Sequence, residues 1–356
     1  MSADNQTIKS DHLSNEFVFT SATPTLIMCS LYMTLGIIAI LANLLDMTVF
    51  VTNREFRRKY MFFIALDVGE LVDGLCYVLT SIGRGSGVLT GTFAIPITIN
   101  DCFFKRYWSH ALIMGTELPA LITIVIAVER ILAVHKPKLY SQIFTFKTKC
   151  LSLVMVGVVQ LCFLAIAGFS AYNNLEKANT RHCAIITSTA TYFSTFHFTF
   201  VVSAYVVSFV SLLVIYVIHR RMKKNSVNSY GNKKDPQLGV FLSFTGLSII
   251  FVAMPSIVMI GIRWQLFAVN DLIVGLTYST TGFLSILNTI LNFTFRAEYR
   301  SQARYLFCGT QPLNSARTVA VTRMPPSRIP STSFNDEPKK PSKATFKTFI
   351  VRLKVL

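Results

Sequence analysis

The residues of this sequence with the clearest chemical potential are charged side chains in or beside long apolar stretches. Glu129 and Arg130 stand side by side at the end of one such stretch. An acid next to an arginine can neutralise it while the surrounding helices are closed, and the arginine is released when they open. Five further acids lie within the apolar stretches, and each is costly to bury and therefore a functional candidate. These acids are Asp46, Asp67, Glu70, Asp73 and Glu117.

Helices that cross a membrane must position these residues. The chain has 356 residues, of which 52% are hydrophobic and 14% are charged, against about 25% charged residues in a typical soluble domain. A helix needs about 20 apolar residues to cross the hydrocarbon core of a bilayer. Seven stretches are that long: residues 25–51, 60–82, 108–134, 150–172, 189–218, 237–262 and 270–295. The sequence therefore predicts an all-α membrane protein whose residues 25–295 form a bundle of seven transmembrane helices.

The basic residues predict the orientation of this bundle. Lys and Arg exceed Asp and Glu by 17, an excess that in a soluble protein would suggest nucleic acid as a partner. Here 27 of the 34 basic residues fall on one side of the predicted spans, as they do in cytoplasmic loops. We therefore expect an extracellular N-terminus (1–24), a disordered basic cytoplasmic tail (309–356), contacts with anionic lipid and no nucleic acid partner.

Four residues are candidates for covalent modification. Of the seven cysteines, only Cys102 and Cys183 lie in predicted outer segments, so the oxidising exterior favours a disulfide between them over two free thiols. Asn5 stands in a glycosylation sequon on the outer side, although such tripeptides are common by chance. Cys308, just inside the last span, is either a palmitoylation site or an unmodified thiol. No CxxC or His cluster indicates a metal site.

The end of the third span carries a resemblance to a known family. Glu129, Arg130, Pro137 and Tyr140 resemble the acid-Arg, Pro and Tyr signature of rhodopsin-like G-protein-coupled receptors. The resemblance implies that Arg130 meets a heterotrimeric G-protein when the bundle opens. It also implies that Tyr216 pairs with this arginine in active states.

The family's intramembrane polar residues have partial counterparts. Asn43 stands in the first span where the family keeps an Asn, and Pro255 takes the place of its kink proline in the sixth. Asp67, Glu70 and Asp73 stand where the family keeps one Asp, which can hold a sodium ion. By distance from Asn43, Glu70 and Asp73 fit that position better than Asp67, and Asp73 is the acid that suits the outer interface.

The end of the seventh span resembles another family motif. Asn288 and Asn292 stand where the family has the Asn and the Tyr of Asn-Pro-x-x-Tyr. The resemblance implies a short amphipathic helix over residues 296–308. In that helix we expect Tyr299 to face the membrane and Arg296 to reach lipid headgroups.

Several departures point to a divergent branch of the family. Thr289 replaces the family's Pro and Ala253 its toggle Trp, while the fourth span lacks its Trp and the fifth its Pro. These losses are similar to those of the nematode serpentine chemoreceptors. Residues 89–92 and 101–103, followed by Glu129 and Arg130, resemble class sx of that branch.

Ligand sites in such bundles lie between the outer halves of the helices. Leu112 occupies the position of the Asp that amine receptors use, so the resemblance disfavours a biogenic amine. Glu117 is either a ligand contact or an internally paired acid. Four aromatic residues lie at heights in the bundle where a ligand could bind. Each is either a ligand contact or a packing or membrane-interface residue: Trp108, His197, Trp264 and Tyr278.

These features favour a chemosensory receptor in the plasma membrane, with a sensory neuronal cilium as the expected site. Its expected partners are an external small molecule or peptide, a G-protein, and further subunits in a homo- or hetero-oligomer. A transporter or channel is the alternative suggested by the intramembrane acids, although no inverted repeat or paired broken helices occur. An orphan partner subunit of another receptor is the alternative suggested by the departures. No nucleophile–base pair or phosphate loop indicates an enzyme, and no cofactor is expected.

Overall fold

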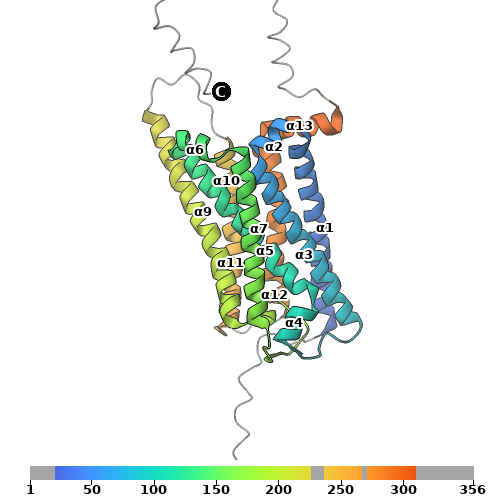
Figure 1. The fold of residues 1–356 in the computed structure, drawn as a ribbon. Helices are drawn as coiled ribbons and strands as arrows, with labels where there is room; N and C mark the ends of the chain where they lie inside the picture. Colours follow the sequence, from blue (N-terminus) through green and yellow to red (C-terminus); the bar gives the residue numbers. More distant parts are fainter. Residues whose placement is uncertain (1–20, 226–235, 267–270, 310–356) are drawn as a thin grey trace, which may run out of the picture. The chain divides into compact units, whose positions relative to one another are not determined.

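Long helices dominate the part of the chain that the structure describes. The structure is a computed structural model, and it describes residues 21–225, 236–266 and 271–309. These residues belong to one compact unit within residues 1–310. Figure 1 shows the long helices running side by side, with α2, α6 and α13 at one end and α4 at the other. The expectations for Asn5 and for the tail beyond residue 309 lie outside the described residues.

In the described part of the chain, the bundle consists of seven helical segments that pack against one another. They are α1 (Ala22–Thr52), α3 (Met61–Leu89), α5 (Tyr107–His135), α7 (Phe146–Ala171), α9 (Thr191–Asn225), the α10–η1–α11 segment, and α12 (Asp271–Phe295). Among the described residues, six helices are long and apolar enough to cross a membrane. Helix α3 is not among these six. It is as long as α5, at 29 residues, but three acids interrupt its apolar sequence. The prediction of an all-α membrane bundle is confirmed.

Short elements connect the long helices. At the end of the bundle that was predicted to be cytoplasmic lie α2 (Arg54–Lys59), α6 (Pro137–Ile143) and α13 (Ala297–Cys308). The opposite end holds α4 (Ile99–Lys105) and α8 (Ile185–Ser188). It also holds a two-stranded antiparallel sheet of β1 (Ile97–Thr98) and β2 (Lys177–Ala178), in which Ile97 pairs with Ala178.

The sixth segment changes its helix type in the middle. Helix α10 (Pro236–Ser248) continues into a π-helix, η1 (Ile249–Ala253), and then into α11 (Met254–Arg263). Pro255 lies in the first turn of α11, where its missing N–H breaks the ordinary hydrogen-bond ladder. π-helical turns of this kind recur at functional sites. The proline expected to kink this span therefore stands next to the change in helix type.

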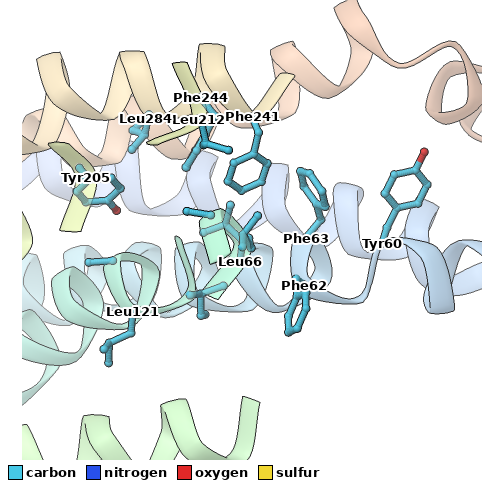
Figure 2. Packing of buried hydrophobic residues seen from close by; sticks show 14 of the residues in the cluster. Tyr60, Phe62, Phe63, Leu66, Leu121, Tyr205, Leu212, Phe241, Phe244 and Leu284 are labelled. Atoms are coloured by element: carbon cyan, nitrogen blue, oxygen red, sulfur yellow. The ribbon is translucent and has the colours of Figure 1, made fainter. Parts of the chain in front are cut away.

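The core divides into two clusters of buried apolar side chains. We name them, and the two ends of the bundle, by the predicted orientation: inner toward α2, α6 and α13, and outer toward α4 and α8. In the inner cluster, Phe63 of α3 meets Phe241 of α10 with their ring centroids 4.9 Å apart and their planes at 80°. Figure 2 shows these two rings among other members of the cluster, with Leu66 and Phe244 close by. Edge-to-face packing of this kind adds to the free energy gained from burial alone. This contact closes the inner end of the bundle between α3 and α10.

Helices α1 and α3 pack closely because two glycines face each other. A Cβ added to Gly36 would lie 2.7 Å from the carbonyl oxygen of Gly74, and one added to Gly74 would lie 3.2 Å from that of Gly36. Small residues at such a contact let helix backbones approach each other within a membrane. This approach sets the position of the acids on α3 relative to α1.

Gly36→Ala is expected to destabilise the purified protein, because the added methyl group has no room. The cost of overpacking is about 1–3 kcal/mol, and a lower melting temperature in thermal unfolding would report it. Gly157→Ala is the matched control, because a Cβ at Gly157 meets nothing within 4 Å. That change should leave the melting temperature equal or slightly higher. Equal melting temperatures for wild type and Gly36→Ala would contradict the close approach.

Candidate functional site

The inner end of α5 holds a buried carboxylate that three groups bind. Glu129 forms an ion pair with Arg130 at 3.2 Å and a shorter one with Lys149 of α7 at 2.6 Å. Tyr140 of α6 donates its hydroxyl hydrogen to the same carboxylate at 3.2 Å. Burial and the adjacent Glu129 raise the pKa of Tyr140, so its hydroxyl stays protonated and keeps donating. Glu129 therefore holds α5, α6 and α7 together.

Lys149 is a member of this site that the sequence analysis did not single out. In the sequence, Lys149 serves only as one of the basic residues that predict the orientation of the bundle. It lies 20 residues beyond Glu129 with a helical loop between them, so the sequence does not indicate their contact. The structure shows Lys149 buried at the start of α7, which its sequence context does not reveal. Pro137 begins α6 and so helps to place Tyr140 beside the carboxylate. Tyr216 packs against the inner core cluster.

Arg130 lies between the buried ring of Phe63 and a cavity that opens at the inner end. Its guanidinium carbon is 5.7 Å from the centroid of the Phe63 ring. The cavity has a volume of about 600 Å³ and no acid among its lining residues, which are Arg58, Lys59, Arg130, Tyr140, Phe144, Phe146 and Lys149. Glu129 pairs with two of these four cations and Glu298 with a third, so the hollow keeps a net positive charge, which attracts an anionic partner.

A second buried carboxylate joins α1 to the end of α12 and to α13. Asp46 accepts hydrogen bonds from Thr289 Oγ1 at 3.1 Å and Asn292 Nδ2 at 2.8 Å, and one from the hydroxyl of Tyr299. The expectation that Tyr299 faces the membrane is wrong, because its hydroxyl reaches Asp46 and its ring is buried against Phe50. Asn292 thus contributes a hydrogen bond to the bundle at the position where the family has a tyrosine.

Arg296 also differs from its predicted place. It was expected to reach lipid headgroups, but it is only 2% exposed. Burial lowers the pKa of Arg296 to about 10, so the guanidinium remains charged at neutral pH. The neighbouring Glu298 does lie at the surface, where it pairs with Lys59 at 2.7 Å. Although burial acts to raise the pKa of Glu298, hydrogen bonds from Lys59 and Tyr60 lower it below its ordinary value.

The three acids of α3 are all buried, and the innermost one meets the seventh span. Asn288 Nδ2 donates to Asp67 at 3.1 Å, while Glu70 hydrogen-bonds Ser285, which also binds Asn43. The preference for Glu70 and Asp73 as the counterpart of the family's Asp stays a prediction. The link between α1 and α3 is short, which brings Asp67 to the height of Asn288. Asp73, for which the outer interface was the alternative, lies against Gly115 of α5 at 6% exposure.

Asn43 contacts the seventh span at the same level of the bundle. Its Nδ2 donates to Ser285 Oγ and to the carbonyl oxygen of Ala39. Ser285 also hydrogen-bonds Glu70. Within residues 21–225, 236–266 and 271–309, no group of three or more His, Cys, Asp or Glu side chains could hold a metal ion.

The outer end is closed by the loop between α7 and α9. The predicted disulfide between Cys102 and Cys183 is present, with its Cα atoms 5.4 Å apart. Next to it, the carbonyl oxygen of His182 accepts hydrogen bonds from Arg84 Nε and Trp108 Nε1. Helix α8 follows, and all four of its residues are buried. The disulfide therefore holds this loop down over the outer core cluster.

Glu117 is paired inside the bundle. Its carboxylate lies 2.7 Å from Nδ1 of His197 on α9 and accepts a hydrogen bond from Gln160 Nε2 of α7 at 3.1 Å. The other ring nitrogen of His197 lies 3.0 Å from Thr116 Oγ1. This network joins three helices at full burial, and Gln160 is a member that its sequence context did not reveal.

The remaining ligand candidates are divided between two places. Trp108, Leu112 and Tyr278 belong to the buried outer cluster. Trp264 is 58% exposed and donates from Nε1 to Thr195 at 3.2 Å. It lines a separate cavity of about 850 Å³ along the outer part of α9.

A loop held by a disulfide at one end, an acid–arginine pair at the other and a bundle of seven helical segments, six of them long and apolar enough to cross a membrane, are features of seven-helix membrane receptors. Residues 90–270 match the family model described as serpentine type 7TM GPCR receptor class ab chemoreceptor, and the chain belongs to this family. Members of this family are receptors. The resemblance to class sx is not confirmed. No curated protein matches the chain.

Glu117→Ala is expected to destabilise the receptor more than Glu117→Gln. Alanine leaves His197 and Gln160 buried without their shared acceptor and opens a cavity, a loss of about 3–5 kcal/mol. The amide of glutamine keeps a hydrogen-bond acceptor of similar size, so its effect should be smaller. Thermal unfolding of wild type and both variants in the same lipid nanodisc checks this. Equal melting temperatures for the three proteins would show that the network adds nothing to stability.

Proposed function

We propose that this receptor binds an external small molecule or peptide and activates a heterotrimeric G-protein through an inner cleft around Arg130. The observation that carries the proposal is the set of contacts to Glu129. One buried carboxylate there neutralises two cations and joins three elements. The family supports a chemosensory receptor in general, and the inner geometry supports G-protein coupling in particular.

The switch works by releasing Arg130. In the closed arrangement its guanidinium is held by Glu129 and lies near Phe63. Phe63 in turn packs against Phe241 of α10. When α10 moves away from α3, the cleft beside Phe63 opens and Arg130 turns toward a G-protein segment. A ligand shifts this equilibrium only by the difference between its affinities for the two states.

On the outer side, we propose that the ligand occupies the region of the buried outer cluster. Trp108, Leu112 and Tyr278 supply apolar surface there. The Glu117–His197 pair lies deeper and would respond to a polar ligand group by exchanging partners. Trp264 lies apart from these residues, so we assign it to the entrance. The loop held by the disulfide must then move to admit the ligand.

We place the N-terminus outside the cell and the tail in the cytosol, in the plasma membrane of a sensory cilium. The disulfide at one end of the bundle and the cation-lined cavity at the other support this orientation. Asn5 is then placed for glycosylation, and Cys308, exposed at the end of α13, for palmitoylation. The intramembrane acids that suggested a transporter each have a hydrogen-bond donor within the bundle, which favours a structural role for them: Asp67, Glu70, Asp73 and Glu117.

Arg130→Ala is expected to abolish G-protein signalling while leaving the receptor at the cell surface. The variant removes the cation that the G-protein meets, but it keeps the Glu129–Lys149 pair. Cells that co-express the receptor with a broadly coupling G-protein would be screened with odorants and peptides by calcium readout. Surface labelling of an N-terminal epitope controls for expression. Responses equal to wild type at equal surface level would contradict the mechanism.

Lys149→Met is expected to raise ligand-independent signalling several-fold. Glu129 would lose its shorter ion pair, so the closed arrangement becomes less stable relative to the open one. Lys147→Met is the matched control, since Lys147 is exposed only two residues away and its replacement removes the same charge. The prediction would be wrong if both variants changed basal signalling equally, because net charge at the inner face would then explain the effect.

A further inference from the structure

Arg296 stands between two helices with its side chain inside the bundle. Helix α12 ends at Phe295 and α13 begins at Ala297, so Arg296 occupies the corner between them. Its backbone N–H donates to the carbonyl oxygen of Asn292, and its own carbonyl accepts from Arg300. The corner is therefore tied to both helices. The side chain is almost completely buried.

Three aromatic rings surround the guanidinium of Arg296. Its central carbon lies 3.8 Å from the ring centroid of Phe63, 5.1 Å from that of Tyr60 and 5.5 Å from that of Phe50. None of its three guanidinium nitrogens has a hydrogen-bond partner among the described residues. Aromatic faces attract a cation, but they offset only part of the cost of removing a charged group from water. The buried guanidinium of Arg296 is therefore stable only if negative charge lies nearby.

Two buried acids lie one helical turn beyond these rings. Asp67 follows Phe63 by four residues on α3, and Asp46 precedes Phe50 by four residues on α1. Residues four apart share a helix face, and α1 and α3 run in opposite directions along the bundle. Each acid therefore lies deeper in the bundle than the ring that contacts Arg296. Both acids interact electrostatically with the guanidinium and with each other.

The partners of the two acids bring them to the same corner. Asp46 is held by Asn292 and Tyr299, which come four residues before and three residues after Arg296. Asp67 is held by Asn288 through one carboxylate oxygen, while the other oxygen, Oδ2, has no hydrogen-bond partner among the described residues. The acids thus have hydrogen bonds from neutral donors, and Arg296 is a cation that interacts electrostatically with both of them.

We propose that Arg296 is a built-in counter-ion for Asp46 and Asp67, and that it replaces a mobile monovalent cation at this level of the bundle. The covalently attached guanidinium supplies a positive charge that a sodium ion would otherwise bring. The receptor's stability is therefore independent of sodium. Loss of Arg296 leaves two carboxylates without a cation, and the bundle then needs one from solution.

The test is thermal unfolding of the full-length receptor in nanodiscs, in sodium chloride and in choline chloride of equal ionic strength. Wild type is expected to melt at the same temperature in both salts. Arg296→Gln is expected to melt lower in choline and to recover in sodium. Arg300→Gln is the control, because Arg300 is only half-buried and its guanidinium donates to the carbonyl oxygens of Phe293 and Thr294. It is expected to behave like wild type in both salts.

A double variant separates charge from packing. Asp67→Asn is expected to reverse part of the loss caused by Arg296→Gln, since fewer uncompensated acids remain. Arg296→Lys, which keeps the charge, should stay insensitive to sodium. These two variants and wild type keep the test decisive if Arg296→Gln alone fails to fold. The proposal is overturned if sodium stabilises wild type through Asp67, or if Arg296→Gln costs as much in the Asp67→Asn background as in the native one.

Discussion

Charge buried in a membrane-spanning bundle has to be balanced within the bundle, and this constraint organises the receptor. An acid inside the hydrocarbon region is stable only with donors or cations beside it. Glu117 meets a histidine and a glutamine, Glu129 meets two cations and a tyrosine, and Asp46 meets three neutral donors. Each acid therefore connects helices that are far apart in the sequence. Their contacts, together with the glycine contact between α1 and α3, set how the bundle is assembled.

Phe63 connects the inner contacts to one another. Its ring packs against Phe241 of α10 and lies near the guanidinium groups of both Arg130 and Arg296. Movement of α10 would therefore change the surroundings of both cations at once. Arg130 is released toward the cytosol in our proposal, whereas Arg296 stays tied to α12 and α13. The two arginines beside the Phe63 ring thus have different roles. Arg130 moves when the bundle opens, and Arg296 keeps its place in the bundle.

Much of the fold could be predicted from the sequence, because membrane spans, basic loops and outer cysteines are local signals. The switch pair Glu129–Arg130 was also visible, since both residues lie in one motif. The partners could not be predicted in the same way. Periodicity predicts that α13 has an apolar face, but not that this face lies against α1, so Tyr299 and Arg296 were assigned to the membrane. Lys149 was missed for the related reason that a contact between two helices leaves no signal in either helix alone.

The central claim is that release of Arg130 from Glu129 is coupled, through Phe63 and Phe241, to separation of α10 from α3. Distances between spin labels at Arg57→Cys and Gly239→Cys test it directly, once the exposed Cys162 and Cys308 have been replaced by serine. A Cβ at Gly239 meets nothing within 4 Å, so a label there should not disturb α10. We predict one short distance in the otherwise native receptor and a second, longer population when Glu129 is replaced by glutamine. Identical distance distributions in the two receptors would contradict the account.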